Sequence, residues 1–368
     1  MNLRIPGPTP CPPEVLEAVS GQMINHRGAE FAELISRVTS GLKQVFQTKN
    51  DVLILTASGT GALEAMVVNT LSPGDRVLAV SIGAFGDRLA GIAQTYGADV
   101  VRLEYEWGRA ADPEDVRKAL AADATIKAVL VTHNETSTGV TNPLAEIARV
   151  VKEAGRLVVV DAISSLGSIP VPVDEWKLDV VASGSQKGWM VPPGLAFVSM
   201  SDEAWRAYEA ARMPRVYFDL KRAKESAEKG QTPWTPAVSL FYGMDVALRL
   251  MLAEGLEQIY QRHARLGQFT RDGVKALGLE LFADERFASN TVTTIKVPEG
   301  LDGKEITRRV RREFDVELAG GQAKLSGKVF RIGHLGLVSE ADLQATLDAL
   351  RAVLPALGFT GAVARQQA

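Results

Sequence analysis

The chain has 368 residues, and 41 Lys and Arg against 44 Asp and Glu give it a formal net charge of −3. Hydrophobic residues make up 46% and charged residues 23%, which is typical of a globular protein and excludes a disordered, collagen-like or coiled-coil chain. So balanced a charge favours neither nucleic acid nor an anionic membrane as a partner. A single cysteine, Cys11, excludes an internal disulfide and a multi-cysteine metal site. The histidines show no metal-ligand spacing.

The N-terminal segment is rich in proline and has no apolar run, so we expect neither a signal peptide nor a membrane span there. The default expectation is a cytoplasmic protein. The rhythm of the sequence changes near residue 255. We therefore expect an extended N-terminal arm in residues 1–20, a large domain in residues 21–255 and a smaller domain in residues 256–368.

Short apolar runs alternate with helical patterns from residue 52 to residue 200. The runs are continuously apolar, which is typical of strands buried on both faces of a sheet. This alternation predicts an α/β fold, with a mostly parallel sheet and helices on both faces. The expected strands are Val52–Thr56, Arg76–Ser81, Asp99–Leu103, Ala128–Thr132, Leu157–Asp161, Val180–Ser183 and Ala196–Met200. The expected helices between them are Gly61–Asn69, Arg88–Tyr96, Pro113–Ala121 and Pro143–Ala154.

The chain after Pro233 has an α+β pattern. We expect two long helices followed by strands and helices in turn. The expected elements are the helices Val238–Glu254 and Leu256–Leu277, the strand Val292–Val297, the helix Lys304–Phe314, the strand Val329–Ile332 and the helix Glu340–Leu354.

The candidate site lies beyond the carboxyl ends of the strands, where open α/β sheets bind their ligands. Ser58, Gly59 and Thr60 follow the first strand and precede a helix, so backbone N–H groups there would converge on an anion such as a phosphate. An ordinary glycine-rich turn is the alternative. Leu63 and Glu64 stand where a dinucleotide fingerprint would need its third glycine, so the pattern does not favour NAD.

Asp161 ends one predicted strand, and Lys187 lies in the glycine-flanked turn that follows another. A carboxylate after four apolar residues is expected to be partly buried and to need a cationic partner. A lysine between glycines after a buried strand could form a Schiff base with an aldehyde. A phosphate seat, a strand-end Asp and a glycine-flanked Lys together match the needs of pyridoxal 5′-phosphate (PLP). Taken singly, the Asp could be a structural ion pair and the Lys a surface residue.

With these residues in view, the chain resembles the class V aminotransferases among the fold-type I PLP enzymes, and within them the alanine–glyoxylate and serine–glyoxylate (serine–pyruvate) group. The resemblance covers almost the whole chain. The segments that carry it are Pro6–Thr9, Ser58–Ala65, Thr132–Gly139, Val160–Gly167, Ser183–Lys187 and Val329–Gly333.

The resemblance implies a role for each matching residue. Lys187 would hold the cofactor as a Schiff base and move the substrate proton, and Asp161 would pair with the ring nitrogen. Arg331 would bind the substrate α-carboxylate with two prongs, and Gly7 would also lie against the substrate. Ser58, Gly59, Thr60 and Gln186 would surround the phosphate, Thr136 would contact the cofactor near its ring oxygen, and Thr232 and Thr235 would reach the phosphate of the neighbouring subunit of a homodimer.

Two positions depart from the family pattern. Phe85 stands where a tryptophan often stacks on the cofactor ring, so the indole N–H is missing there. Thr232 stands where a tyrosine is often found, which leaves that phosphate contact open. His26 and Arg27 lie in a segment that is near the active site in the family, although a solvated loop is an equal alternative. His133 and His334 follow strands and could line the pocket or serve as structural polar groups.

The resemblance implies a PLP-dependent aminotransferase that moves an amino group from alanine or serine to glyoxylate or pyruvate in a ping-pong reaction. A phosphonate-handling transaminase of the same class is an alternative. A cysteine desulfurase is disfavoured because it needs a thiol on a mobile loop in the C-terminal part, and the single thiol, Cys11, is in the N-terminal arm. An inactive PLP-fold subunit of a larger complex is the non-enzymatic alternative.

Overall fold

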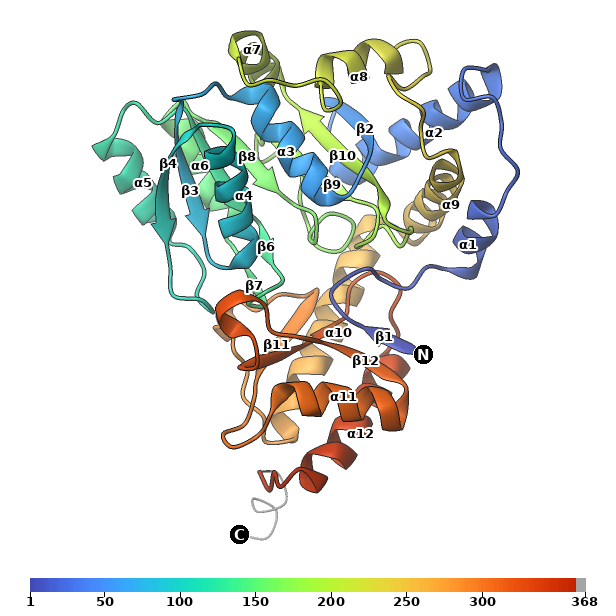
Figure 1. The fold of residues 1–368 in the computed structure, drawn as a ribbon, viewed down its shortest axis with the longest axis vertical. Helices are drawn as coiled ribbons and strands as arrows, with labels where there is room; N and C mark the ends of the chain where they lie inside the picture. Colours follow the sequence, from blue (N-terminus) through green and yellow to red (C-terminus); the bar gives the residue numbers. More distant parts are fainter. Residues whose placement is uncertain (362–368) are drawn as a thin grey trace.

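A seven-stranded sheet forms the larger part of the computed structural model, which describes residues 1–361 (Figure 1). Its strand order is β2-β10-β9-β8-β5-β3-β4. Neighbouring strands are parallel except β10, which runs antiparallel to both β2 and β9. The predicted α/β fold with a mostly parallel sheet is confirmed. The strands are β2 (Asp51–Ala57), β3 (Arg76–Ser81), β4 (Asp99–Glu104), β5 (Ala128–Thr132), β8 (Leu157–Asp161), β9 (Val180–Gly184) and β10 (Gly194–Met200).

Helices cover both faces of this sheet and bury a separate apolar layer on each. Along β2, Val52 and Ile54 belong to one layer, while Leu53 and Leu55 belong to the other, because successive side chains of a strand point to opposite faces. One layer is covered by α1 (Pro13–Val19), α2 (Ala29–Phe46), α5 (Pro113–Ala122), α6 (Leu144–Glu153) and α9 (Val238–Glu254). The other is covered by α3 (Gly59–Thr70), α4 (Ala84–Thr95), α7 (Asp202–Ala210) and α8 (Leu220–Ala227).

A second sheet, of order β1-β12-β13-β11, is built mainly from the C-terminal part of the chain. Figure 1 shows β1, the blue strand at the N-terminus, beside the orange and red elements. The expected extended arm therefore needs correction: its first residues pair in parallel with β12, and its last residues form α1. The elements are β1 (Asn2–Arg4), β11 (Val292–Lys296), β12 (Val316–Gly320), β13 (Val329–Gly333), α10 (Leu256–Ala276), α11 (Gly303–Phe314) and α12 (Glu340–Ala356).

The domain bounds predicted from the sequence stay a prediction, and the end of the last domain, residues 362–368, lies outside the described residues. The described chain turns at Gly255 between α9 and α10, next to the expected boundary. A short hairpin of β6 (Asn134–Glu135) and β7 (Val140–Thr141) follows β5. In residues 1–361 we find no helix with the length and apolarity that crossing a bilayer requires.

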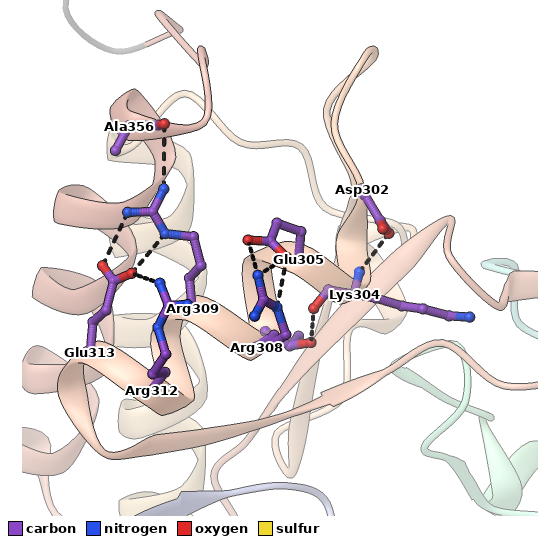
Figure 2. A network of polar contacts seen from close by, with 9 residues as sticks. Asp302, Lys304, Glu305, Arg308, Arg309, Arg312, Glu313 and Ala356 are labelled. Atoms are coloured by element: carbon purple, nitrogen blue, oxygen red, sulfur yellow. Dashed lines mark hydrogen bonds and ion pairs between the residues drawn. The ribbon is translucent and has the colours of Figure 1, made fainter.

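Helix α11 carries arginine–glutamate ion pairs on its outer face (Figure 2). Arg308 contacts Glu305 at 2.6 Å, and Arg309 contacts Glu313 at 2.8 Å. Arg309 also donates to the carbonyl oxygen of Ala356 at 3.4 Å, which connects α11 to the end of α12. Helix pairs of this kind contribute only about 0.3–0.5 kcal/mol each, so the apolar face beneath them does most to hold α11 against the sheet.

Candidate active site

A cavity lies at the carboxyl ends of the parallel strands, where the sheet topology brings several loops together. Seven of the residues predicted from the sequence line it: Gly59, Thr60, Phe85, Thr136, Asp161, Gln186 and Lys187. Sequence reasoning missed the other lining residues, which are Leu63, Arg88, Asn134, Ile163 and Ser164. Asn134, Ile163 and Ser164 lie two or three residues after the ends of β5 and β8, so a wider search beyond the strand ends would have found them.

Lys187 projects from the turn between β9 and β10, and its Nζ donates a hydrogen bond to the carbonyl oxygen of Pro6 at 2.7 Å. Gly7 packs on the same side chain, since a Cβ there would overlap Nζ and would lie only 2.8 Å from Cε of Lys187. The pKa of Lys187 is lowered to about 8, mainly by burial and then by the positive charge of Arg331, while Asp161 acts in the opposite direction. A fraction of this amine is therefore neutral, and nucleophilic, near neutral pH.

Asp161 ends β8 and is 3% exposed. Its Oδ1 accepts a hydrogen bond from the backbone N–H of Ile163 at 3.0 Å, and its Oδ2 has a long contact of 3.5 Å with Oγ1 of Thr132. Burial raises the pKa of Asp161 to about 7; the Ile163 N–H opposes this shift, and the negative charge of Glu135 adds to it. A cationic group in the cavity would therefore stabilise the ionised form of this buried carboxylate.

The turn before α3 has the features of an anion seat. Ser58 precedes the helix and its side chain forms no capping hydrogen bond. Gly59 is packed so closely that a Cβ would lie 2.7 Å from Cδ1 of Ile163. Gln186 Oε1 is buried and has no hydrogen-bond partner in the described part of the chain. Backbone N–H groups at this helix start, with free polar side chains beside them, suit a phosphate.

Arg88 adds a positive charge to this side of the cavity. Its Nη1 lies 3.4 Å from Oγ1 of Thr60, and its guanidinium carbon lies 4.7 Å from the centre of the Phe85 ring. Phe85 and Arg88 are three positions apart on α4, so their side chains share one helix face. No local pattern in the sequence points to Arg88, since it lies inside a helix and not at a strand end.

Arg331 lies on β13 and is 4% exposed. Its Nε donates to the carbonyl oxygen of Gly320 at 3.0 Å, and its Nη1 donates to that of Thr136 at 2.9 Å. Burial lowers the pKa of Arg331 to about 10, and the negative charge of Glu135 opposes the shift. The guanidinium is thus fixed between the small sheet and the loop after β5.

The remaining predicted residues lie elsewhere in this chain. Thr235 is exposed, and Thr232 is buried with its hydroxyl donating to the Trp234 carbonyl at 2.7 Å. Arg27, next to His26, donates to the carbonyl oxygen of Thr232 at 2.6 Å, so these two predicted segments lie side by side. None of these four residues lines the Lys187 cavity.

The two strand-end histidines also lie outside the cavity. His133 lines a separate cavity of about 560 Å³ together with Trp176, whose ring it meets edge-on at 6.0 Å. His334 is buried and bonded to Thr293 Oγ1 at 2.9 Å and to the Asn290 carbonyl at 3.1 Å. Burial lowers the pKa of both imidazoles to about 3. The two hydrogen bonds of His334 favour the structural alternative for it, whereas the buried Nδ1 of His133 has no hydrogen-bond partner in the described residues.

Comparison with known proteins supplies the family. The family profile described as "Aminotransferase class-V" matches residues 1–335. The chain belongs to the class V aminotransferases. Its geometry agrees with that of a solved alanine–glyoxylate aminotransferase from Nostoc sp., with a TM-score of 0.92 and 33% identity over 96% of this chain and 94% of the other. The chain is an aminotransferase of fold type I, and its cofactor is PLP.

Two curated relatives show how names vary among similar chains. A serine–glyoxylate aminotransferase of Methylorubrum extorquens is 42% identical, covering 93% of this chain and 88% of that protein. A protein of Synechococcus sp. named "Soluble hydrogenase, small subunit" is 49% identical, covering 97% and 94%. Iron–sulfur clusters are held by several thiolates, and this aminotransferase has one cysteine. Residues 1–361 also hold no cluster of three or more side chains suited to a metal ion.

The residues of the cavity fit PLP. The unpartnered Oε1 of Gln186 and the crowded Gly59 belong to the end that suits its phosphate. Asp161 offers a buried carboxylate to a protonated ring nitrogen, and Lys187 offers an amine to an aldehyde carbon. The cavity thus offers a suitable partner to each of three groups of PLP: its phosphate, its ring nitrogen and its aldehyde carbon.

Proposed function

We propose that this aminotransferase transfers an amino group from alanine or serine to glyoxylate or pyruvate in a ping-pong reaction. The observation that carries the proposal is Lys187: a buried amine whose pKa is lowered to about 8, in one cavity with Asp161 and within the electrostatic reach of Arg331. The serine–glyoxylate relative and the alanine–glyoxylate neighbour support the choice of substrates.

In this proposal PLP, when bound, supplies an electron sink for negative charge at the substrate Cα. Asp161 holds a proton on the ring nitrogen, and the ion pair thus formed relieves the cost of burying its carboxylate. Ser58, Gly59, Thr60 and Gln186 would bind the phosphate, and Arg88 would add a charge beside them. Phe85 would lie against the ring, and Thr136 would contact the ring oxygen.

Lys187 would hold the cofactor covalently through Nζ. The same Nζ, when free, would take the proton from the substrate Cα and later give a proton back. A pKa near 8 suits both tasks at neutral pH, since the amine must accept and donate protons in turn.

Arg331 would bind the substrate α-carboxylate, and Gly7, which packs against the Lys187 side chain, would lie against the substrate. Two of the arginine's nitrogens are already bonded to backbone carbonyls, which fixes its plane before the substrate arrives. Thr232 and Thr235 are proposed to reach the phosphate of the neighbouring subunit in a homodimer. The homodimer and the cytoplasmic location stay predictions from the sequence.

The test is a panel of amino donors and 2-oxo acid acceptors, ranked by kcat/KM for the purified enzyme and for Lys187→Ala. We expect alanine and serine to exceed aspartate as donors, and glyoxylate and pyruvate to exceed 2-oxoglutarate as acceptors. Turnover by Lys187→Ala at the native rate would contradict the role of the lysine. A chain that binds no PLP would favour the inactive subunit of a larger complex.

A further inference from the structure

Glu135 is a buried carboxylate beside the cavity to which neither the sequence prediction nor the proposed function gives a role. It lies in β6 and is 0% exposed. Its Oε2 accepts hydrogen bonds from the backbone N–H groups of Phe85 and Gly86, each at 3.0 Å. Its Oε1 accepts from the backbone N–H and the hydroxyl of Ser137, at 3.1 and 2.5 Å. All four contacts come from donors, so the ionised carboxylate can accept them together; burial raises the pKa of Glu135, and these hydrogen bonds oppose that rise.

These bonds connect β6 to the start of α4, a helix 50 positions earlier in the chain. The first N–H groups of a helix have no partner within it, and a carboxylate placed there satisfies them and is favoured by the helix dipole. Ser137 adds to the connection, since its Oγ accepts from the backbone N–H of Ala84 at 3.0 Å. A Cβ on Gly83 would lie 2.5 Å from Cδ of Glu135, so the two segments are in direct contact.

The parts that Glu135 joins are those that face the cavity. Phe85 begins the turn of α4 that presents its ring and the Arg88 guanidinium. Thr136 follows Glu135 directly, lines the cavity, and accepts the Arg331 hydrogen bond through its carbonyl. The Glu135 carboxylate is therefore connected to three proposed positions: Phe85 at the cofactor ring, Thr136 at the ring oxygen, and Arg331 at the substrate carboxylate.

We propose that Glu135 is a positioning residue of this aminotransferase: its carboxylate fixes the start of α4 and the Thr136 backbone relative to each other, and thereby sets the spacing between Phe85, proposed to stack on the cofactor ring, and Arg331, proposed to bind the substrate carboxylate. The proposal rests on the proposed function for its catalytic consequence, but the positioning itself is a property of the protein without cofactor.

The negative charge of Glu135 gives the proposal a second measurable consequence, which is a change in the pKa of Asp161. The charged groups that act on Asp161 are Glu135 from β6, Lys187 from the β9–β10 turn and Arg88 from α4, and Glu135 is the one that raises its pKa. Replacing Glu135 by Gln removes that repulsion, so the pKa of Asp161 falls. Replacing it by Asp keeps the negative charge, but the shorter side chain reaches less far toward the backbone N–H groups of α4. The two variants therefore separate the effect of the charge from the effect of these hydrogen bonds.

The experiment compares Glu135→Gln, Glu135→Asp and Ser137→Ala with the matched control Asp179→Asn. Asp179 is also a buried carboxylate that accepts a backbone N–H, from Val158 at 2.9 Å, and it does not line the cavity. The first readout is amide hydrogen exchange of the segment 83–88 in the cofactor-free protein. The second is the KM for the amino acid and the PLP dissociation constant, each measured across pH.

We expect all three site variants to speed exchange in segment 83–88 by about ten-fold or more, since hydrogen bonds to a charged group are lost or weakened, and the control to leave it unchanged. KM and the PLP dissociation constant should rise by about ten-fold in Glu135→Gln, and the acidic limb of the pH profile should move to lower pH in that variant alone.

Unchanged exchange in Glu135→Gln would overturn the positioning role, whatever the activity. Faster exchange with unchanged KM and PLP affinity would overturn its link to the site. A wild-type protein without transamination would contradict the proposed function, while the exchange result would still decide the positioning role.

Discussion

The Nζ of Lys187 lies 2.7 Å from the carbonyl oxygen of Pro6, a residue 181 positions earlier in the chain. Pro6 follows β1, which pairs with β12 of the small sheet, whereas Lys187 follows β9 of the large sheet. The contact therefore joins the two sheets at the reacting lysine. The N-terminal segment is a wall of the site because β1 is anchored in the C-terminal sheet.

Gly7 provides the first test of this wall. It has a φ of 129°, and a Cβ there would overlap the Lys187 side chain. We expect Gly7→Ala to lower kcat/KM by about 100-fold or more, because displacing a reacting group by about 1 Å has that effect. The matched control is Gly300→Ala, at a φ of 82° with nothing within 4 Å, which introduces backbone strain alone. Equal activity of the two variants would show that Lys187 tolerates the change.

Asp161 predicts a pH dependence of stability in the cofactor-free protein. Its folded-state pKa, about 7, is above its ordinary value, so the folded protein binds the proton more tightly than the unfolded chain. The stabilisation is complete below the ordinary pKa of about 4 and is lost as the pH rises through 7; three pKa units correspond to about 4 kcal/mol.

Asp161→Asn keeps the shape of the side chain and removes its ionisation. We expect this variant to be more stable than the wild type at pH 8, to lose the difference near pH 4, and to transaminate at least about 100-fold more slowly. Thermal unfolding across pH checks the first two points. A variant that is less stable than the wild type at pH 8 would contradict the origin given for the pKa shift.

Arg331 is proposed to bind the substrate carboxylate, and its charge lowers the pKa of Lys187. Two substitutions separate these effects. Arg331→Lys keeps the charge and loses the two-pronged contact, while Arg331→Gln loses both. We expect KM for the amino acid to rise by about 10- to 100-fold in each. The pKa of Lys187 should rise in Arg331→Gln, since the arginine's charge helps to lower it, so cofactor attachment in that variant moves to higher pH. An identical pH profile for both variants would contradict the electrostatic coupling.

Arg88 is expected to strengthen cofactor binding. Arg88→Gln should raise the PLP dissociation constant by about ten-fold, and the effect should shrink as the salt concentration rises, because Arg88 is exposed. Arg117→Gln, on the distant helix α5, is the control for a lost surface charge. Titration with PLP, followed by fluorescence at two ionic strengths, measures the dissociation constant and its salt dependence for both variants. A salt-independent effect would indicate a structural role for Arg88 instead.

The large sheet could be predicted from the sequence because its strands are buried on both faces. Continuous runs such as Leu157–Asp161 have no alternation and few other interpretations. The strand-end rule then led to Asp161 and Lys187. Among the elements that the sequence did not predict, α2 contains Gly41 and several β-branched residues, so packing outweighs its propensity, and β12 is a short strand with only two buried residues.

The functional side chains that were missed depend on contacts between distant segments. Arg88 reaches the cavity because it lies over Phe85, and no local pattern marks its direction. Glu135 lies in the segment Thr132–Gly139, which carries the family resemblance, but no local pattern indicates its role, because that role depends on the packing of α4 against it. Thr232 and Thr235 are predicted to act on a neighbouring subunit, so a single chain cannot bring them to its own cavity. Pairing of β1 with β12 is likewise a non-local relationship.

The most direct test of the aminotransferase proposal is a single half-reaction followed by visible absorbance. The purified protein is loaded with PLP, and alanine or serine is added without an acceptor. We expect the visible band of the lysine-bound cofactor to disappear with release of one equivalent of 2-oxo acid per site, and glyoxylate to restore the band. Lys187→Ala should show neither change at a comparable rate. A wild-type protein that binds PLP but whose band persists with every small amino acid tested, with no oxo acid formed, would contradict the proposal.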